Sequence, residues 1–156
     1  MDHYSSLKKL LGNDIDSHFF DSIESTNSFL ANSPYSTNSQ LCITREQTKG
    51  RGQHGRDWVS QKDGSIIFSL RKSFAEDTNV NGLSLVVGMA IIKSIEVECQ
   101  LNSLKIKWPN DVYFGDKKLA GILMENSFDK GIQYVLIGVG VNYQLGEKMD
   151  IDIPWT

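Results

Sequence analysis

"SLKIKWPNDVYFGDKKLAGILMEN" (residues 103–126) decides the fold, because its apolar and polar residues alternate as they do in strands. In "SLKIKW" this alternation places Leu104, Ile106 and Trp108 on one face and two lysines on the other. We therefore expect Trp108 to be buried with its two aliphatic neighbours. Pro109 removes a ladder donor and keeps the residue before it extended, so the strand should end at the proline.

The remaining apolar segments complete a sheet with few helices. "DVYFGDKKLAGILMEN" indicates a hairpin that turns at Gly115-Asp116, and "IQYVLIGVGVNY" is too apolar for a strand exposed on both faces. In one long helix, apolar residues recur every four positions, at Leu83, Val87, Ile91 and Ile95. We also predict short helices at 4–12 and 26–32, and strands at 17–25, 40–46 and 64–71. Strands grouped in this way favour an α+β fold, with helices packed on a mixed, mainly antiparallel sheet.

Length and charge narrow the range of partners. The 156 residues suffice for a single domain, 1–156, with 40% apolar residues and a net charge of −3. No overall basic field exists to attract nucleic acid or a membrane, so anion binding must be local. No apolar run has the length of a membrane span and no signal peptide is recognisable, so we expect a cytoplasmic protein. Cys42 and Cys99 lie in apolar stretches and are predicted to be buried, reduced thiols.

The segment "TKGRGQHGRDW" (residues 48–58) combines three glycines with four side chains that can carry positive charge. One interpretation is a solvated surface loop; the other is an anion cradle, in which glycines let backbone N–H groups turn toward a phosphate. "GRGQHG" is followed by a strand rather than a helix, which excludes a dinucleotide-binding fingerprint, and no G-K-[ST] of a P-loop is present.

Three further features are candidate site residues. Lys107 sits at a strand end, where it is either solvent-facing or held ready to neutralise a carboxylate or phosphate. "STN" (residues 25–27) is typical of a helix cap, and its hydroxyl and amide groups equally suit a polar heterocycle. Gln47, at the start of the glycine loop, offers amide chemistry for the same purpose. No His or Cys cluster indicates a tight metal site, so any metal would be Mg²⁺ carried by a nucleotide.

Four segments in order carry a family resemblance: "STN", "EQTKGRGQHGRDW", "KIKWPNDVYFGDKKLAGILME" and "IGVGVN". From about Ser22 to Tyr143 the chain resembles the catalytic domain of biotin protein ligases, with "KWPNDVY…KKLAGIL" as the most specific segment. The resemblance implies the α+β fold of class II aminoacyl-tRNA synthetases and lipoyl ligases. It also implies a reaction of biotin with MgATP that gives biotinyl-5′-adenylate, followed by transfer to a lysine of a biotin carboxyl carrier domain.

Site residues follow from the resemblance by position. It implies catalytic roles for Lys107 and Arg51, the first between the biotin carboxylate and the α-phosphate. It implies contacts to biotin or its adenylate from Ser25, Thr26, Asn27, Gln47, Gly50, Arg51, Gly52, Gln53, Lys107 and Gly121. Arg56 and Asn142 would face the nucleotide. Closure of the glycine loop would shield the adenylate from water.

The chain departs from the family pattern in two ways, and two alternatives stay open. Gln53 stands where a basic residue is usual, and His54 beside it could partly compensate. The family's domain normally continues into further helices and a small β-domain, so we expect a C-terminally incomplete domain. No helix-turn-helix precedes it, which argues against a repressor role. The alternatives are a lipoate or octanoate ligase or transferase, and a non-catalytic biotin-binding fragment. A homodimer is a candidate assembly.

Overall fold

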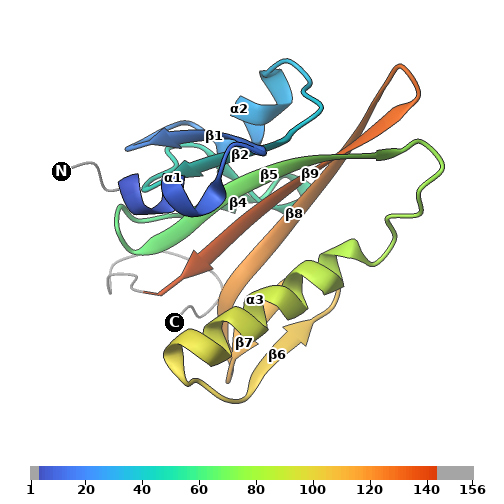
Figure 1. Cartoon of the computed structure of the whole chain (residues 1–156). Helices are drawn as coiled ribbons and strands as arrows, with labels where there is room; N and C mark the ends of the chain where they lie inside the picture. Colours follow the sequence, from blue (N-terminus) through green and yellow to red (C-terminus); the bar gives the residue numbers. More distant parts are fainter. Residues whose placement is uncertain (1–3, 144–156) are drawn as a thin grey trace.

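A computed structural model describes residues 4–143 as one seven-stranded mixed sheet with three helices (Figure 1). The strand order is β1-β2-β5-β9-β8-β7-β6; β1 and β2 are parallel and every other neighbouring pair is antiparallel. The elements are α1 Ser5–Leu11, β1 Ile15–Phe20, α2 Thr26–Asn32, β2 Ser39–Thr44, β3 Gly50–Arg51, the 3-10 helix η1 Gln53–Gly55, β4 Asp57–Trp58, β5 Ser65–Ala75, α3 Leu83–Cys99, β6 Leu104–Lys107, β7 Asp111–Phe114, β8 Lys117–Asp129 and β9 Ile132–Asn142. The predicted α+β class with a mainly antiparallel sheet is therefore confirmed.

The two faces of the sheet carry different helices (Figure 1). α3 packs over β6, β7 and β8, and its four-residue stripe lies against the main apolar cluster as predicted. α2 packs on β2, β5 and β9, where Leu30, Cys42 and Leu136 form a second, smaller cluster. Because side chains alternate along each strand, every strand contributes to both layers. The predicted burial of β9 on both faces is confirmed, since all of its residues after Ile132 are buried.

Local sequence explains where the helices begin and end. Ser25 caps α2, its hydroxyl accepting a hydrogen bond from the Ser28 N–H at 3.3 Å. α1 ends at Gly12, which has a φ of +67°, a conformation that glycine adopts without a steric penalty. The hairpin of β7 and β8 turns at Gly115 and Asp116, as predicted.

The predicted burial of Trp108 is wrong: its side chain is 78% exposed. β6 ends at Lys107, and the tryptophan lies in the turn that leads to β7. The alternation of Leu104 and Ile106 thus stops before it reaches Trp108. Cys99, also predicted to be buried, is exposed at the end of α3, whereas Cys42 is buried.

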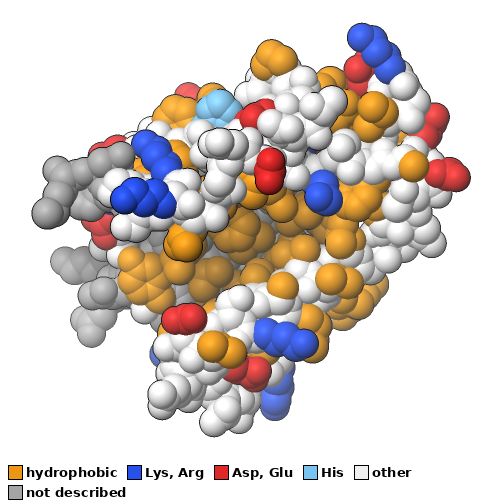
Figure 2. Space-filling model, in the orientation of Figure 1, with side chains coloured by type: hydrophobic (Ala, Val, Ile, Leu, Met, Phe, Trp, Pro, Cys, Tyr) orange, Lys and Arg blue, Asp and Glu red, His pale blue; other side chains and the backbone are white. Residues whose placement is uncertain are grey.

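Part of the apolar surface stays open in the described residues. Figure 2 shows hydrophobic side chains gathered over the central strands beside α3. Exposed apolar residues include Ile66 of β5 and Val86, Met89 and Val97 of α3. Among the residues that the structure describes, no helix is both long and apolar enough to cross a bilayer.

Candidate active site

A hollow of about 470 Å³ opens on the α2 face of the sheet, over a floor that includes glycines of β8 and β9. Gly121 of β8 pairs with Gly140 of β9, and Gly138 lies two residues further along the same face. A Cβ atom at Gly138 would collide with the Asn27 amide, and one at Gly121 would lie 2.7 Å from the Trp58 ring. The glycines therefore make room for Asn27 and Trp58, which line the hollow.

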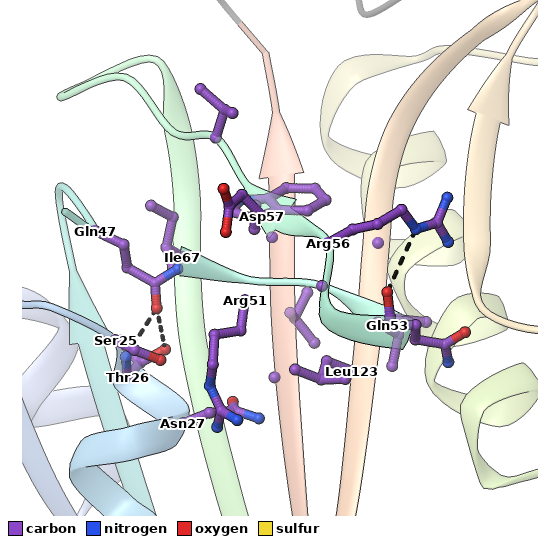
Figure 3. Close-up of a pocket in the computed structure, with 18 of the residues that line it drawn as sticks. Ser25, Thr26, Asn27, Gln47, Arg51, Gln53, Arg56, Asp57, Ile67 and Leu123 are labelled. Carbon is purple, nitrogen blue, oxygen red and sulfur yellow. Dashed lines mark hydrogen bonds between the residues drawn. The ribbon is translucent and has the colours of Figure 1, made fainter. Parts of the chain in front are cut away.

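The N-terminus of α2 supplies the polar end of this hollow (Figure 3). Gln47 Oε1 accepts hydrogen bonds from the Thr26 backbone N–H at 2.8 Å and from its hydroxyl at 3.0 Å. Ser69 of β5, which the sequence analysis did not identify, contacts Asn27 Oδ1 at 2.5 Å and Thr26 Oγ1 at 2.7 Å. Thr26, Asn27 and Gln47 are thus brought together as predicted, and the buried serine ties them to the sheet.

The glycine loop covers the hollow as a small two-stranded ribbon. β3 and β4 pair through Gly50 with Trp58 and Arg51 with Asp57, an element that the sequence analysis missed. The Gly52 N–H bonds to the Arg56 carbonyl at 2.7 Å, so this N–H is used inside the loop rather than for an anion. Arg51 points toward Asn27 in Figure 3 and pairs with Glu125 at 3.1 Å. In the described conformation that amide is therefore not available to an anion.

Trp58, at the end of the ribbon, lies directly on the glycine floor. Cβ atoms built at Gly121 and Gly140 would both collide with its indole ring. The Lys118 ammonium is 5.5 Å from the centre of the same ring, within the range of a cation–π contact. The loop thus has one large aromatic contact with the sheet.

Lys118 lines the hollow, although the sequence analysis did not single it out. It is 9% exposed, and its Nζ lies 2.8 Å from Asp111 Oδ1. A Cβ atom at Gly121 would be 3.3 Å from this Nζ, so the ammonium rests against the floor. The bulge at Val112/Tyr113 makes this possible, because residues 118 and 121 would point to opposite faces in a regular strand.

Lys107, the predicted catalytic lysine, lies at the end of the same row of the sheet. It pairs with Asp111, and Asp111 pairs with Gly121. Two strand spacings therefore separate Lys107 from Gly121, roughly 10 Å between Cα atoms. Lys107 lines a second hollow, of about 990 Å³, that adjoins the first, and its Nζ is 5.1 Å from the centre of the Tyr113 ring.

The other predicted residues divide into two groups. Ser25, Arg51, Gly52, Gln53, Arg56 and Gly121 line the first hollow. Arg51, Gly52, Gln53 and Arg56 also line the second hollow, which links the two spaces. Gly50 and Asn142 do not line either hollow: Gly50 packs against Trp58, and Asn142 is fully buried with its Oδ1 accepting from the Ser65 hydroxyl at 2.7 Å.

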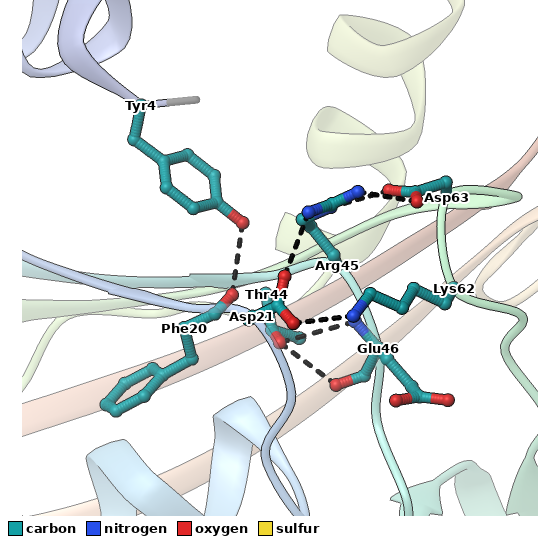
Figure 4. A network of polar contacts seen from close by, with 8 residues as sticks. All are labelled: Tyr4, Phe20, Asp21, Thr44, Arg45, Glu46, Lys62 and Asp63. Carbon is teal, nitrogen blue, oxygen red and sulfur yellow. Dashed lines mark hydrogen bonds and ion pairs between the residues drawn. The ribbon is translucent and has the colours of Figure 1, made fainter. Parts of the chain in front are cut away.

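An ion-pair network fixes the return limb of the loop to the sheet (Figure 4). Arg45 forms a two-pronged contact with Asp63, both distances being 2.6 Å, and also bonds to Asp21 at 2.9 Å. Lys62 bonds to Asp21 at 2.5 Å. The hydrogen bond from Lys62 lowers the pKa of Asp21, and the hydrogen bond from Arg45 lowers the pKa of Asp63. Both carboxylates are thus held ionised at neutral pH.

The outgoing limb of the loop is fixed by backbone hydrogen bonds. The Thr48 N–H bonds to the Ile23 carbonyl at 2.9 Å, and the Lys49 N–H to the Glu24 carbonyl at 2.8 Å. Both limbs of the loop are thus attached on either side of the ribbon between Gly50 and Trp58. No group of three or more His, Cys, Asp or Glu residues suited to a metal occurs in residues 4–143.

Together these features define a candidate small-molecule pocket with cationic side chains in its wall. Its floor carries the Trp58 ring packed on glycines, its α2 end offers amide and hydroxyl groups, and its wall carries Lys118 and Arg51. Such convergence of a few polar groups on an apolar space is typical of ligand pockets.

Comparison with known proteins agrees with this geometry. The Biotin/lipoate A/B protein ligase family matches residues 19–142. The bifunctional ligase/repressor BirA of Escherichia coli is 34% identical over 123 residues, covering 77% of this chain and 38% of that protein. The biotin–[acetyl-CoA-carboxylase] ligase of Mycobacterium tuberculosis is 36% identical over 118 residues, covering 72% and 42% respectively. The biotin protein ligase of Aquifex aeolicus in complex with biotin and ATP superimposes with a TM-score of 0.74 at 31% identity, covering 90% of this chain and 58% of that one.

This chain therefore belongs to the Biotin/lipoate A/B protein ligase family. It spans less than half the length of the two curated relatives named above.

Proposed function

We propose that this chain forms the biotin-activating site of a biotin–protein ligase. In the first step an oxygen of the biotin carboxylate attacks the α-phosphorus of ATP, and the bond to the pyrophosphate leaving group breaks. In the second step a lysine amine of a carboxyl carrier domain attacks the acyl carbon of the adenylate and releases AMP. Mg²⁺ would enter with ATP as part of that substrate.

The observation that carries the proposal is the glycine-floored hollow between α2 and the loop. Its volume of about 470 Å³ lies in the usual range for small-molecule sites. A bicyclic ring would lie beside Trp58 and Asn27, which pack on Gly140 and Gly138, with its polar edge toward Thr26 and Gln47. Relatives named as biotin ligases, and a similar structure in complex with biotin and ATP, support biotin as the acid.

The positions of the cations suggest how the first step is promoted. A carboxylate is ionised at neutral pH, so the attack needs positioning and charge neutralisation rather than a general base. We propose that Lys118, which pairs with Asp111 and lies against the floor, neutralises the reacting carboxylate and α-phosphate together with Arg51 of the loop. Donors fixed in advance in this way stabilise developing charge at low reorganisation cost.

The second hollow would then take the rest of the nucleotide or the incoming carrier lysine. Arg56 and Lys107 line it, and Arg51 belongs to both spaces. Lys107 stays a predicted catalytic residue, while the geometry favours Lys118 for the contact with the reacting groups.

The test is calorimetry of the chain with biotin, alone and with MgATP, together with pyrophosphate release from the same mixture. We expect biotin binding and biotin-dependent pyrophosphate release. Binding without release would indicate the non-catalytic alternative, and a preference for lipoate would indicate the neighbouring ligase class. The absence of any biotin binding would refute the proposal.

A further inference from the structure

We propose that Glu125 is a positioning residue that fixes both the polar end of the hollow and the loop above it. Glu125 lies on β8, and its side chain is 36% exposed. One oxygen, Oε2, accepts a hydrogen bond from Asn27 Nδ2 at 2.7 Å and another from Arg51 Nη2 at 3.1 Å. A single carboxylate oxygen therefore joins α2 to the glycine loop.

The first consequence concerns the direction of the hydrogen bonds. An ionised carboxylate only accepts, so the Asn27 NH₂ group must face Glu125 and its Oδ1 must face Ser69. The Ser69 hydroxyl directs its single proton toward Asn27 Oδ1 at 2.5 Å and Thr26 Oγ1 at 2.7 Å, and the Thr26 hydroxyl donates to Gln47 Oε1 at 3.0 Å. Gln47 Oε1 accepts from both the backbone N–H and the hydroxyl of Thr26, which leaves the Gln47 NH₂ group as a donor at the edge of the hollow.

The second consequence concerns the loop. Arg51 is the loop cation that points toward α2, and Glu125 is its ion-pair partner. The two side chains are 46% and 36% exposed, so their ion pair stabilises the closed loop only weakly. Breaking the pair should increase the population of the open loop about two- to fivefold. A comparable ion pair in the same loop, Lys49 with Glu24, is more exposed and touches neither Asn27 nor the hollow.

Replacing Glu125 by glutamine tests both consequences at once. The glutamine amide can donate as well as accept, so the orientation of Asn27, Ser69 and Thr26 is no longer fixed. We expect biotin to bind about tenfold more weakly, as for the loss of a charge-assisted hydrogen bond. The KM for ATP should stay within twofold. A general loss of structure would instead reduce the active fraction and therefore lower the apparent turnover rate.

The experiment compares wild type, Glu125→Gln and Glu24→Gln in three measurements. Hydrogen exchange of residues 48–58 without ligand should be about two- to fivefold faster in Glu125→Gln, and unchanged in Glu24→Gln. Calorimetry gives the Kd for biotin, and kinetics give the KM for ATP. Circular dichroism checks folding; should Glu125→Gln not fold, Glu125→Asp replaces it, because the shorter side chain cannot reach both partners.

The inference is overturned if loop exchange in Glu125→Gln equals that in Glu24→Gln, or if the biotin Kd changes by less than twofold. The binding measurement rests on the proposed function, whereas the exchange measurement does not. A wild-type chain that binds no biotin would refute the proposed function, and loop exchange alone would then decide the role of Glu125.

Discussion

Lys118 and its neighbour Lys117 form a matched pair for testing the site, because both lie on β8 but only Lys118 is buried in the hollow. Methionine keeps most of the side-chain length and removes the charge. We expect Lys118→Met to slow biotin-dependent pyrophosphate release by about two orders of magnitude, or ~3 kcal/mol of transition-state stabilisation. Lys117→Met, which alters an exposed side chain, should stay within about twofold of the wild-type rate.

The same substitution has a separate effect on stability. It leaves the Asp111 carboxylate, whose side chain is only 18% exposed, without the ammonium at 2.8 Å. Leaving a mostly buried polar group unsatisfied costs about 1–3 kcal/mol of unfolding free energy. Adding Asp111→Asn removes that uncompensated charge, so the double variant should regain most of its melting temperature without regaining its rate. Thermal melts and pyrophosphate assays on the same samples separate the two effects.

Pyrophosphate release by Lys118→Met within threefold of wild type would refute this reasoning. A larger loss in Lys107→Met than in Lys118→Met would return the central role to Lys107; Lys105→Met, another exposed lysine of β6, is the control for that comparison. Affinity for a non-hydrolysable analogue of biotinyl-adenylate gives a second readout that does not depend on turnover.

Three further outcomes follow from the structure. Trp108→Ala should lower the unfolding free energy by less than about 1 kcal/mol because the ring is 78% exposed, whereas Leu104→Ala should cost about 2–5 kcal/mol; denaturant titration compares them. Gly140→Ala should weaken biotin binding in calorimetry by at least tenfold, about 1.4 kcal/mol, because the new methyl group collides with the Trp58 ring. The network around Arg45 stabilises the fold at pH values above about 4, because the pKa of Asp63 is lowered from its ordinary value of 3.8. That contribution to stability declines as the pH falls below 3.8. Hydrogen exchange in residues 59–64 should then accelerate more than in β9.

Periodicity predicted those elements whose burial is decided within one segment. The stripe at Leu83, Val87, Ile91 and Ile95 identifies the face of α3 that packs on the sheet, and the structure confirms it. The hairpin at Gly115 and the apolar β9 follow from turn chemistry and composition in the same way. Trp108 shows the limit of this reasoning, since alternation indicates a face but does not tell whether the strand continues to the next residue.

The choice between the two lysines depends on information that alternation does not contain. In a regular strand Lys118 would point away from Gly121, and the sequence gives no sign of the bulge that turns it back. Lys107 ends a strand next to an aromatic residue, and these local features made it the more conspicuous candidate. Ser69 and Glu125 were missed for a similar reason: their roles come from contacts to residues 42 and 98 positions away, respectively.

Part of the glycine floor can be recognised in the sequence itself. Gly138 and Gly140 are two residues apart, so they must share a face of their strand. Glycine inside a strand costs roughly 0.5–1 kcal/mol relative to alanine, so three of them on one floor cost roughly 2 kcal/mol. A sheet centre that forgoes side-chain packing in this way indicates that something must approach its backbone closely. In the structure that neighbour is Trp58 over Gly140 and Asn27 over Gly138. The stability given up by the floor thus makes room for Trp58 and Asn27, which line the hollow, and a side chain added at Gly138 or Gly140 must displace one of them.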